Sequence, residues 1–198
     1  MTDFYSLDGN QPTAHQRRPA YVREDEWIRA LLRRGQVVHI GTRWDDQPFV
    51  TPTNYYFDEA SHRLIFHSNI AGRLRANIER HPRVAAEVSE IGRVLPSNVA
   101  LEFSQQYRSV MVFGEARLIQ DVTEQRELMH ALIAKYFPEM ELGKDYRPAS
   151  ELELKRTTIY GLEIESWSGK ENWKEQADQS EEWPALDARF MGIETPRG

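Results

Sequence analysis

Three short segments of the chain place polar or charged side chains where a strand or helix is expected to begin or end. The first spans 50–55 and reads VTPTNY. Proline interrupts the hydrogen-bond ladder of a strand, so it is confined to edges, ends and bulges. The hydroxyl and amide groups of Thr51, Thr53 and Asn54, which flank Pro52, can therefore face a ligand. An ordinary edge strand is the alternative interpretation.

The second segment joins an apolar strand to a helix. Residues 66–69 (FHSN) end the strand with the polar side chains of His67 and Ser68, and a helix is predicted a few residues later. Gly72 and Arg73 lie in its first turn, where backbone N–H groups are free and the helix dipole is positive. An arginine there is unfavourable for the helix itself, and a bound phosphate would explain it. A solvent-facing arginine is the alternative.

The third segment, 105–110 (QQYRSV), precedes a long apolar strand. Tyr107, Arg108 and Ser109 offer a stacking plane, a cation and a hydroxyl, although such residues are also common where a strand begins. Taken together, the three segments suit a phosphorylated aromatic ligand bound across the strands of a barrel.

Several common chemistries lack their motifs in this chain. It contains no G-x-x-x-x-G-K-[ST] loop, no G-x-G-x-x-G and no G-x-S-x-G. The absence of cysteine excludes disulfides, iron–sulfur clusters and thiol nucleophiles. The histidines show no spacing typical of metal ligands, and they stand at positions 15, 39, 62, 67, 81 and 130. What remains is a binding module, or an enzyme whose chemistry belongs to a cofactor.

Composition favours a single globular domain. The chain has 198 residues, of which 40% are hydrophobic, and a formal net charge of −6. A general binder of nucleic acid or of anionic membranes would normally be basic. No apolar run approaches the roughly 18 residues that a membrane helix needs, and the N-terminal residues do not read as a secretory signal. We therefore expect a cytoplasmic protein with neither nucleic acid nor membrane as a partner.

Hydrophobic periodicity predicts an α+β protein. Helices are expected over 23–34, 71–81 and 123–136, and strands over 36–43, 49–57, 63–67, 83–90, 107–119 and 157–167. Residues 91–105 predict a long loop, and Gly114 predicts a bulge or a close backbone approach. Because the first three strands follow one another through short polar turns, the sheet should be antiparallel.

Five sequence strings follow one another over about 150 residues of the chain. They are VTPTNYYF, IFHSNIAGRLRAN, EVSEIGRVLPSN, QYRSVMVFGEARL and WSGKENW. Their order resembles that of the FMN-binding split-barrel superfamily, which is related to pyridoxamine 5′-phosphate oxidase. Within the superfamily, the chain is most similar to the nitroimidazole-resistance (Nim-type) proteins. The resemblance implies a six-stranded antiparallel split β-barrel with flanking helices, and a homodimer that binds FMN at two sites on the subunit interface.

The resemblance also assigns site residues. His67 stands at the position of the Nim-type active-site histidine and is the expected catalytic residue. The expected contacts to FMN are Thr51, Pro52, Thr53, Asn54, His67, Ser68, Gly72, Arg73, Leu74, Arg108, Ser109, Trp167 and Lys170, and no metal is expected. Many oxidase members carry lysine where this chain has Leu74, so the phosphate contact would rest on Arg73 and Arg75.

The implied function is reduction of the nitro group of a 5-nitroimidazole, a small flat aromatic substrate, by reduced FMN. One alternative is a non-catalytic flavin or haem binder or sensor of the same fold. Another is an oxidase of the pyridoxamine-phosphate type. We expect an N-terminal arm over 1–22, the FMN-binding domain over 23–167, and an acidic tail over 168–198. Trp173 and Trp183 predict that this tail packs on the partner subunit or beside the site.

Overall fold

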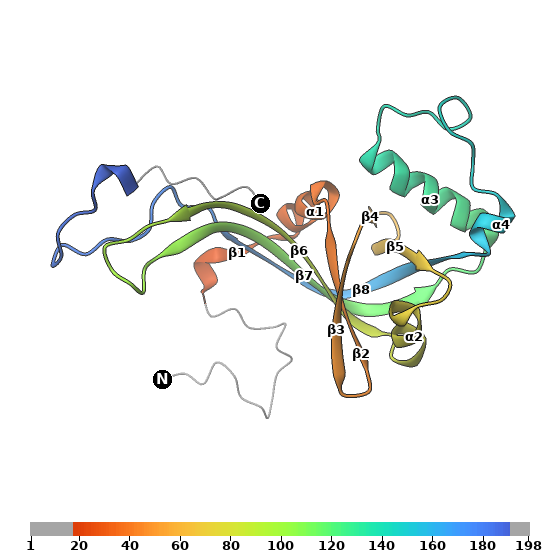
Figure 1. Cartoon of the computed structure of the whole chain (residues 1–198), viewed down its shortest axis with the longest axis horizontal. Helices are drawn as coiled ribbons and strands as arrows, with labels where there is room; N and C mark the ends of the chain where they lie inside the picture. The colour runs from red at the N-terminus through yellow and green to blue at the C-terminus, as the bar shows by residue number, and fades with distance from the viewer. Residues whose placement is uncertain (1–17, 191–198) are drawn as a thin grey trace.

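A single antiparallel sheet organises the protein (Figure 1). The computed structural model describes residues 18–190; residues 1–17 of the predicted arm and residues 191–198 of the predicted tail lie outside the described residues. The strands are β1 (Val22–Arg23), β2 (Val38–Trp44), β3 (Gln47–Thr53), β4 (Tyr55–Asp58), β5 (Arg63–Asn69), β6 (Arg83–Leu95), β7 (Ser104–Leu118) and β8 (Thr157–Asn172). Their order is β3-β2-β6-β7-β8-β5-β4, and β1 also pairs with β8.

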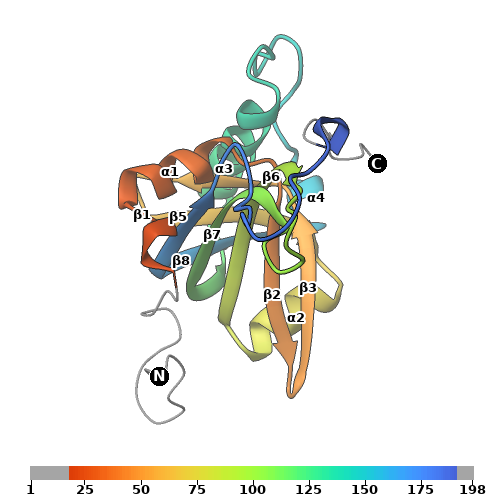
Figure 2. The same ribbon diagram turned by 90° about the vertical axis from the view of Figure 1, so that its left-hand side faces the viewer.

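Four α-helices surround this sheet in the described part of the chain. They are α1 (Asp25–Arg34), α2 (Arg73–Arg80), α3 (Val122–Tyr136) and α4 (Glu151–Leu154), accompanied by the short 3-10 turns η2 (Pro19–Tyr21) and η3 (Ala188–Phe190). Figure 2 shows α1 and α2 near opposite ends of the strands, while α3 and α4 lie at the end of the molecule remote from the β6–β7 hairpin tip (Figure 1).

The main core lies between the sheet and the helices α1 and α2. Helix α1 buries Ile28, Leu31 and Leu32, and its charges complement the helix dipole because Asp25 lies in its first turn and Arg34 in its last. A second, smaller core packs Leu128 of α3 against the opposite face of the sheet, on Ile65 and Ile159. The two cores place helices on both sides of β5 and β8.

The antiparallel α+β class is confirmed, but the sheet has eight strands and is open, so the six-stranded barrel is not what the structure shows. The prediction of one strand over 49–57 was wrong, because the chain leaves the ladder at Asn54. Before that residue, β3 pairs with β2; after it, β4 pairs with β5. The eighth strand is β1, whose Val22 lies opposite Lys170.

The predicted long loop over 91–105 was too long, because β6 continues to Leu95 and β7 begins at Ser104. A register shift between Ile91 and Val94 accommodates the irregular sequence, and the Gln106 side chain accepts a hydrogen bond from the backbone N–H of Arg93. The remaining connection, 96–103, is fastened to the tail: the Ser97 hydroxyl donates to the carbonyl of Asp178. The tail thus packs along the β6–β7 hairpin of its own chain (Figure 1).

The predicted helices are confirmed with small shifts. Helix α3 matches the predicted helix over 123–136, and Asp121 caps it by accepting the N–H of Glu124. Helix α2 is shorter than predicted and begins at Arg73. The last strand extends beyond Trp167 to Asn172 because β7 is long enough to pair with all of it.

The bulge predicted at Gly114 is confirmed, since the β7–β8 register shifts between Phe113 and Gly114. A Cβ at Gly114 would lie 1.8 Å from the carbonyl oxygen of Glu163.

We expect Gly114→Ala to lower the free energy of unfolding by about 3 kcal/mol or more, since backbone must move to relieve the overlap. At Gly41 a Cβ would lie 3.4 Å from the carbonyl oxygen of Ala85, so Gly41→Ala is the matched control. Urea denaturation measures both, and equal effects would contradict the prediction.

Candidate functional site

The first turn of α2 is the most distinctive polar feature near the predicted site. Its N-cap residue, Gly72, offers no side-chain hydrogen bond, and the first turn contains no acidic residue. Free backbone N–H groups and the positive end of the dipole are therefore left without an internal counter-charge. A Cβ at Gly72 would meet nothing within 4 Å, so the backbone here is open to a ligand. Leu74 is buried in the core, which leaves only its amide for a ligand.

Helix α2 and β3 come together on the core-facing side of the sheet. The Arg73 guanidinium lies 4.6 Å from the centroid of the Phe49 ring. One helical turn later, Asn77 Nδ2 donates to the Thr42 hydroxyl, 3.0 Å away, in a buried contact. Because Phe49 and Thr42 are register partners, these two contacts fix the direction in which α2 approaches the hairpin.

The predicted residues of β3 therefore face two ways. Thr51 and Thr53 lie opposite the buried Ile40 and Val38, so they share the face of Phe49 and Arg73. Pro52 is exposed and points to the other face. Asn54 is exposed at the break between β3 and β4.

The end of β5 carries a hydrogen-bonded chain that leads to α2. The Ser68 hydroxyl and the Tyr160 hydroxyl are 2.8 Å apart. Thr158, two residues away on β8, accepts a 3.4 Å hydrogen bond from Arg75 Nη1. Sequence analysis did not select Thr158 or Tyr160 as site residues, because both read as ordinary members of an apolar strand. Only the β5–β8 register, which pairs Ser68 with Thr158, shows their relation to the site.

His67 faces the opposite side of β5 from Ser68 and Phe66. It shares this face with Ile65, against which α3 packs. Its Nδ1 is buried and has no hydrogen-bond partner among residues 18–190. Burial lowers the pKa of the imidazole. At neutral pH the ring is therefore predominantly neutral, and it can donate a hydrogen bond through one N–H rather than act as a cation.

A second buried nitrogen lies beside the break in the sheet. Lys135 Nζ has no hydrogen-bond partner and lies 3.4 Å from the centroid of the Tyr55 ring. Burial lowers the pKa of this amine to about 7. The aromatic face favours the ammonium by about 2 kcal/mol. Burial can lower the pKa of an amine by several units, and each unit corresponds to roughly 1.4 kcal/mol against the ammonium. The desolvation of the ammonium therefore outweighs its attraction to the ring. Sequence analysis placed Lys135 on a helix and missed this environment.

The predicted contact Arg108 is already neutralised within its own chain. Its Nε donates to Glu171, 2.7 Å away, its Nη1 lies 3.3 Å from Glu90, and its guanidinium stacks 3.9 Å from the centroid of the Trp173 ring. Glu90 also pairs with Arg34 of α1. The structure therefore places Arg108 in an ion-pair ladder between strands and α1, apart from the cluster at α2.

Trp167 and Lys170 do not share a face. Trp167 is opposite the buried Val112, and its indole N–H donates to Asp25 at the start of α1. Lys170 is opposite Ser109 on the other face of the sheet. The structure thus places Arg73 of α2 beside Phe49, on the face of β3 that carries Thr51 and Thr53, and it places Ser68 on the same side of β5 as the core residue Phe66. The predicted residues that lie apart from this group in the single chain are Pro52, His67, Arg108, Ser109, Trp167 and Lys170.

Residues 18–190 contain neither a cluster of metal ligands nor a helix able to span a membrane. No group of three or more His, Asp or Glu side chains is arranged to hold a metal ion in this part of the chain. The helices described there are too short or too polar to cross a bilayer.

Comparison with known proteins identifies similar chains. A family model described as pyridoxamine 5′-phosphate oxidase matches residues 24–171. The flavocytochrome Anf3 from Azotobacter vinelandii is 28% identical, with a TM-score of 0.76 over 87% of this chain and 78% of its own. An FAD- and haem-binding protein from Mycobacterium smegmatis is 22% identical, with a TM-score of 0.71 over 80% of this chain and 76% of its own.

A candidate 5-nitroimidazole antibiotic resistance protein from Bacteroides thetaiotaomicron is 20% identical, with a TM-score of 0.62 over 75% of this chain and 85% of its own. The two structures below 25% identity show a shared fold. No curated protein has a sequence that matches this chain.

The buried amine of Lys135 predicts an unusual pH dependence of stability. Its pKa is lower in the folded chain, about 7, than the ordinary value of 10.5. The unfolded chain therefore binds the extra proton between these values, and the cost of burying the charge is fully present below pH 7. We expect Lys135→Met to raise the free energy of unfolding by roughly 1–3 kcal/mol at pH 6. The gain should decline as pH rises from 7 and vanish above 10.5.

Urea denaturation of both proteins across this pH range measures the effect. Lys144→Met, on an exposed side chain, is the matched control and should show no such trend. A gain that is independent of pH would show that packing, rather than the buried charge, sets the difference.

Proposed function

Because the chain belongs to the pyridoxamine 5′-phosphate oxidase family, we propose that it is a flavin-dependent reductase that holds the phosphate of FMN at the first turn of α2. The observation that carries this proposal is the Arg73 guanidinium, which stands at an uncapped helix N-terminus. Within residues 18–190 no carboxylate forms an ion pair with Arg73, although most other arginines of the chain have one.

The residues present fit a flavin phosphate. The open backbone at Gly72 and the amides of the first turn can donate hydrogen bonds to phosphate oxygens, and Arg73 supplies the opposite charge. The Ser68 hydroxyl lies at the end of β5, just before this turn. Arg75 pairs with Glu79, 2.9 Å away, so in the first turn of α2 Arg73 is the cation that no carboxylate of the described residues neutralises. One cation suits the single phosphate of FMN better than the pyrophosphate of FAD.

The neighbouring side chains suit an aromatic ring system beside that phosphate. Thr51 and Thr53 offer hydroxyl groups on the face of β3 that α2 approaches, and the Asn54 amide is free at the break. Bound FMN would supply electron transfer to an acceptor. The protein's own contribution is to orient the ring and to exclude water. The neutral His67 imidazole lies on the opposite face of β5 from Ser68, so in this proposal its N–H donates to an acceptor oxygen that approaches from that face.

We propose a flat nitroaromatic molecule of the 5-nitroimidazole type as the acceptor. The support is the resemblance of the FHSN string to Nim-type proteins and the hydrogen-bond donor that His67 offers to a nitro oxygen. An uncharged donor in a partly buried position stabilises developing negative charge more than it would in water.

We also propose that a second copy of the chain completes the site. The face of the sheet opposite α1 and α2 carries Val50 and Ile91, whose exposed fractions are 69% and 58%. Ser109 and Lys170 lie on this same face. An exposed apolar sheet face is typical of an interface. Pairing two such faces would bring Lys170 of one chain toward the other chain, which is how residues that lie apart in one protomer can serve one site.

Haem binding at His67 is a second candidate function. The observation that favours it is the buried, unpaired Nδ1 on a ring held neutral by burial, because neutral imidazole is the form that ligates metals. The similarity to a flavocytochrome at 28% identity supports the same idea. His67 would then hold the haem iron rather than donate a hydrogen bond to the acceptor.

The phosphate assignment predicts how Arg73 affects flavin binding. We expect Arg73→Gln to weaken FMN binding by about 10- to 100-fold, because one charge-assisted contact is lost. Riboflavin, which lacks the phosphate, should bind both proteins equally. Fluorescence titration of the apoprotein measures both affinities. The dimer proposal has its own test: light scattering of the holoprotein should give twice the chain mass of 23.1 kDa.

Arg80→Gln is the matched control, because Arg80 lies at the other end of α2 and pairs with Asp45. It should leave the FMN affinity within about twofold. If Arg73→Gln weakens riboflavin as much as FMN, the guanidinium does not hold the phosphate.

The role of His67 can be tested without knowing the physiological electron donor. We expect His67→Ala to bind FMN within about twofold of the unmodified chain, while oxidation of the dithionite-reduced holoprotein by metronidazole slows about 10- to 100-fold. Anaerobic stopped-flow absorbance measures this rate. His62→Ala is the control, since His62 packs against Trp167, 4.6 Å between ring centroids.

Titration with haemin separates the two candidate functions. A Soret band that appears with the unmodified chain and is lost in His67→Ala, together with an unchanged rate of metronidazole reduction, would replace the reductase proposal with the haem-binding one.

A further inference from the structure

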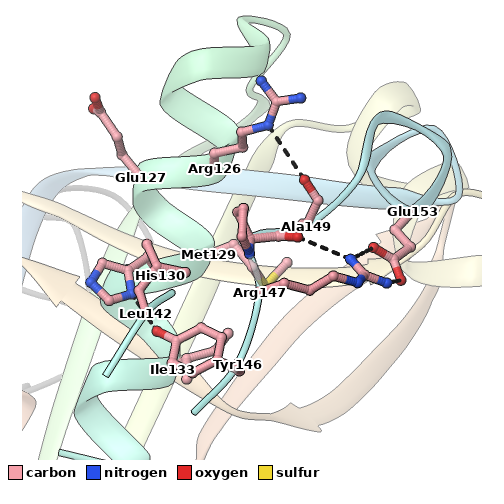
Figure 3. A pocket seen from close by; sticks show the side chains of 11 residues that line it. Arg126, Glu127, Met129, His130, Ile133, Leu142, Tyr146, Arg147, Ala149 and Glu153 are labelled. Atoms are coloured by element: carbon pink, nitrogen blue, oxygen red, sulfur yellow. Dashed lines mark hydrogen bonds and ion pairs between the residues drawn. The ribbon is translucent and has the colours of Figure 1, made fainter. Parts of the chain in front are cut away.

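A large cavity lies outside the proposed flavin site, between α3 and the segment that leads to α4 (Figure 3). Its volume is about 660 Å³, which falls in the range of about 300–1,000 Å³ typical of small-molecule sites. The lining side chains come from one face of α3 and from residues 142–149, followed by Glu153 of α4. The residues assigned to FMN are not among them.

The walls are mainly apolar. Met129 and Ile133 of α3 face Leu142, Pro148 and Ala149 across the cavity. Leu142 is 43% exposed, so its side chain is accessible to a ligand in the cavity. An apolar molecule would gain by removing this surface from water.

Two pairs of polar side chains lie in the wall, and within each pair the two side chains bind one another. His130 Nδ1 and the Tyr146 hydroxyl form a hydrogen bond across the cavity, which holds the segment against α3. Arg147 points toward Glu153 and binds it through both terminal nitrogens, at 2.7 and 2.8 Å (Figure 3). Neither pair leaves a net charge for a ligand.

Arg126 is the exception. Its Nε makes one long hydrogen bond, 3.4 Å, to the carbonyl of Ala149 at the edge of the cavity. Among the described residues no carboxylate pairs with its guanidinium. The neighbouring Glu127 is exposed, and Figure 3 shows its side chain directed away from Ala149. The mouth of an apolar cavity therefore carries one cation whose terminal nitrogens can bind an anion.

We propose that this cavity binds a small organic acid, with its apolar body between α3 and the 142–149 segment and its anionic group on Arg126. The apolar walls select the body, and the planar guanidinium matches a carboxylate or sulfonate in a bidentate contact. The ligand class follows from these two features together. A neutral apolar molecule would fill the cavity but leave Arg126 unused.

The probe for this test is 8-anilinonaphthalene-1-sulfonate, which combines an aromatic body with one anion. N-phenyl-1-naphthylamine is its uncharged counterpart. Isothermal titration calorimetry of the FMN-loaded protein should show one sulfonate per chain. Arg126→Met should weaken the sulfonate about tenfold and change the neutral amine by less than about twofold, because only the ionic contact is lost. Arg126→Lys should restore part of the difference.

Two further variants locate the site. Ala149→Trp fills the cavity from the segment side and should abolish binding of both probes; its melting temperature shows whether it is folded. Glu182→Gln removes one negative charge from an exposed residue of the tail, outside the cavity lining, and should leave both affinities within about twofold.

Three outcomes would overturn the proposal. The first is that the sulfonate does not bind at concentrations up to about 1 mM. The second is that Ala149→Trp leaves the dissociation constant of the sulfonate unchanged. The third is that Arg126→Met weakens the affinity for both probes equally. The last outcome would mean that the arginine shapes the cavity and does not receive the anion. FMN titrations on the same variants keep this result separate from the flavin proposal.

Discussion

The hydroxyl of Tyr136 binds the backbone beside the break between β3 and β4, and the arrangement of the proposed flavin site depends on this break. It accepts the backbone N–H of Tyr55, 3.0 Å away, and donates to the carbonyl of Gln36 at 2.7 Å. These contacts tie the first residue of β4 to α3 and to the segment that precedes β2. The chain separates at Asn54, because β3 pairs with β2 and β4 pairs with β5. The face of β3 then turns toward α2, where Arg73 meets Phe49.

Arg73 at the first turn of α2 differs from most other arginines on the surface in how its charge is compensated. Arg34, Arg80, Arg108 and Arg147 each bind a carboxylate, and most of these pairs are exposed enough to contribute less than about 1 kcal/mol. Their value is to position strands and helices rather than to stabilise them. Arg73 has a helix dipole of the same sign beside it and an aromatic ring beneath it. The ring favours the cation and the dipole opposes it by similar small amounts, so neither supplies the opposite charge that a bound phosphate would provide.

Local sequence patterns predicted the helices, the antiparallel sheet and the Gly114 bulge, because each depends on residues close in sequence. They could not predict the break at Asn54, since the tyrosine hydroxyl that binds beside it lies 81 residues along the chain from Tyr55. The same limit hid Thr158 and Tyr160, whose relation to Ser68 comes from the β5–β8 register. It also made Trp167 and Lys170 appear to share one site, although three positions apart on a strand means opposite faces.

Helix α3 separates the two proposed sites while contributing to both regions. The helical period places Leu128, Leu132 and Lys135 toward the sheet, and it places Arg126, Met129, His130 and Ile133 toward the cavity. Leu128 and Leu132 are buried, so the sheet-facing side is fixed by packing whether or not the cavity is filled. A ligand in the cavity gains its binding energy from the other face and from the 142–149 segment. Binding there need not move His67 or the Tyr136 hydroxyl, so occupancy of one site should be readable independently of the other.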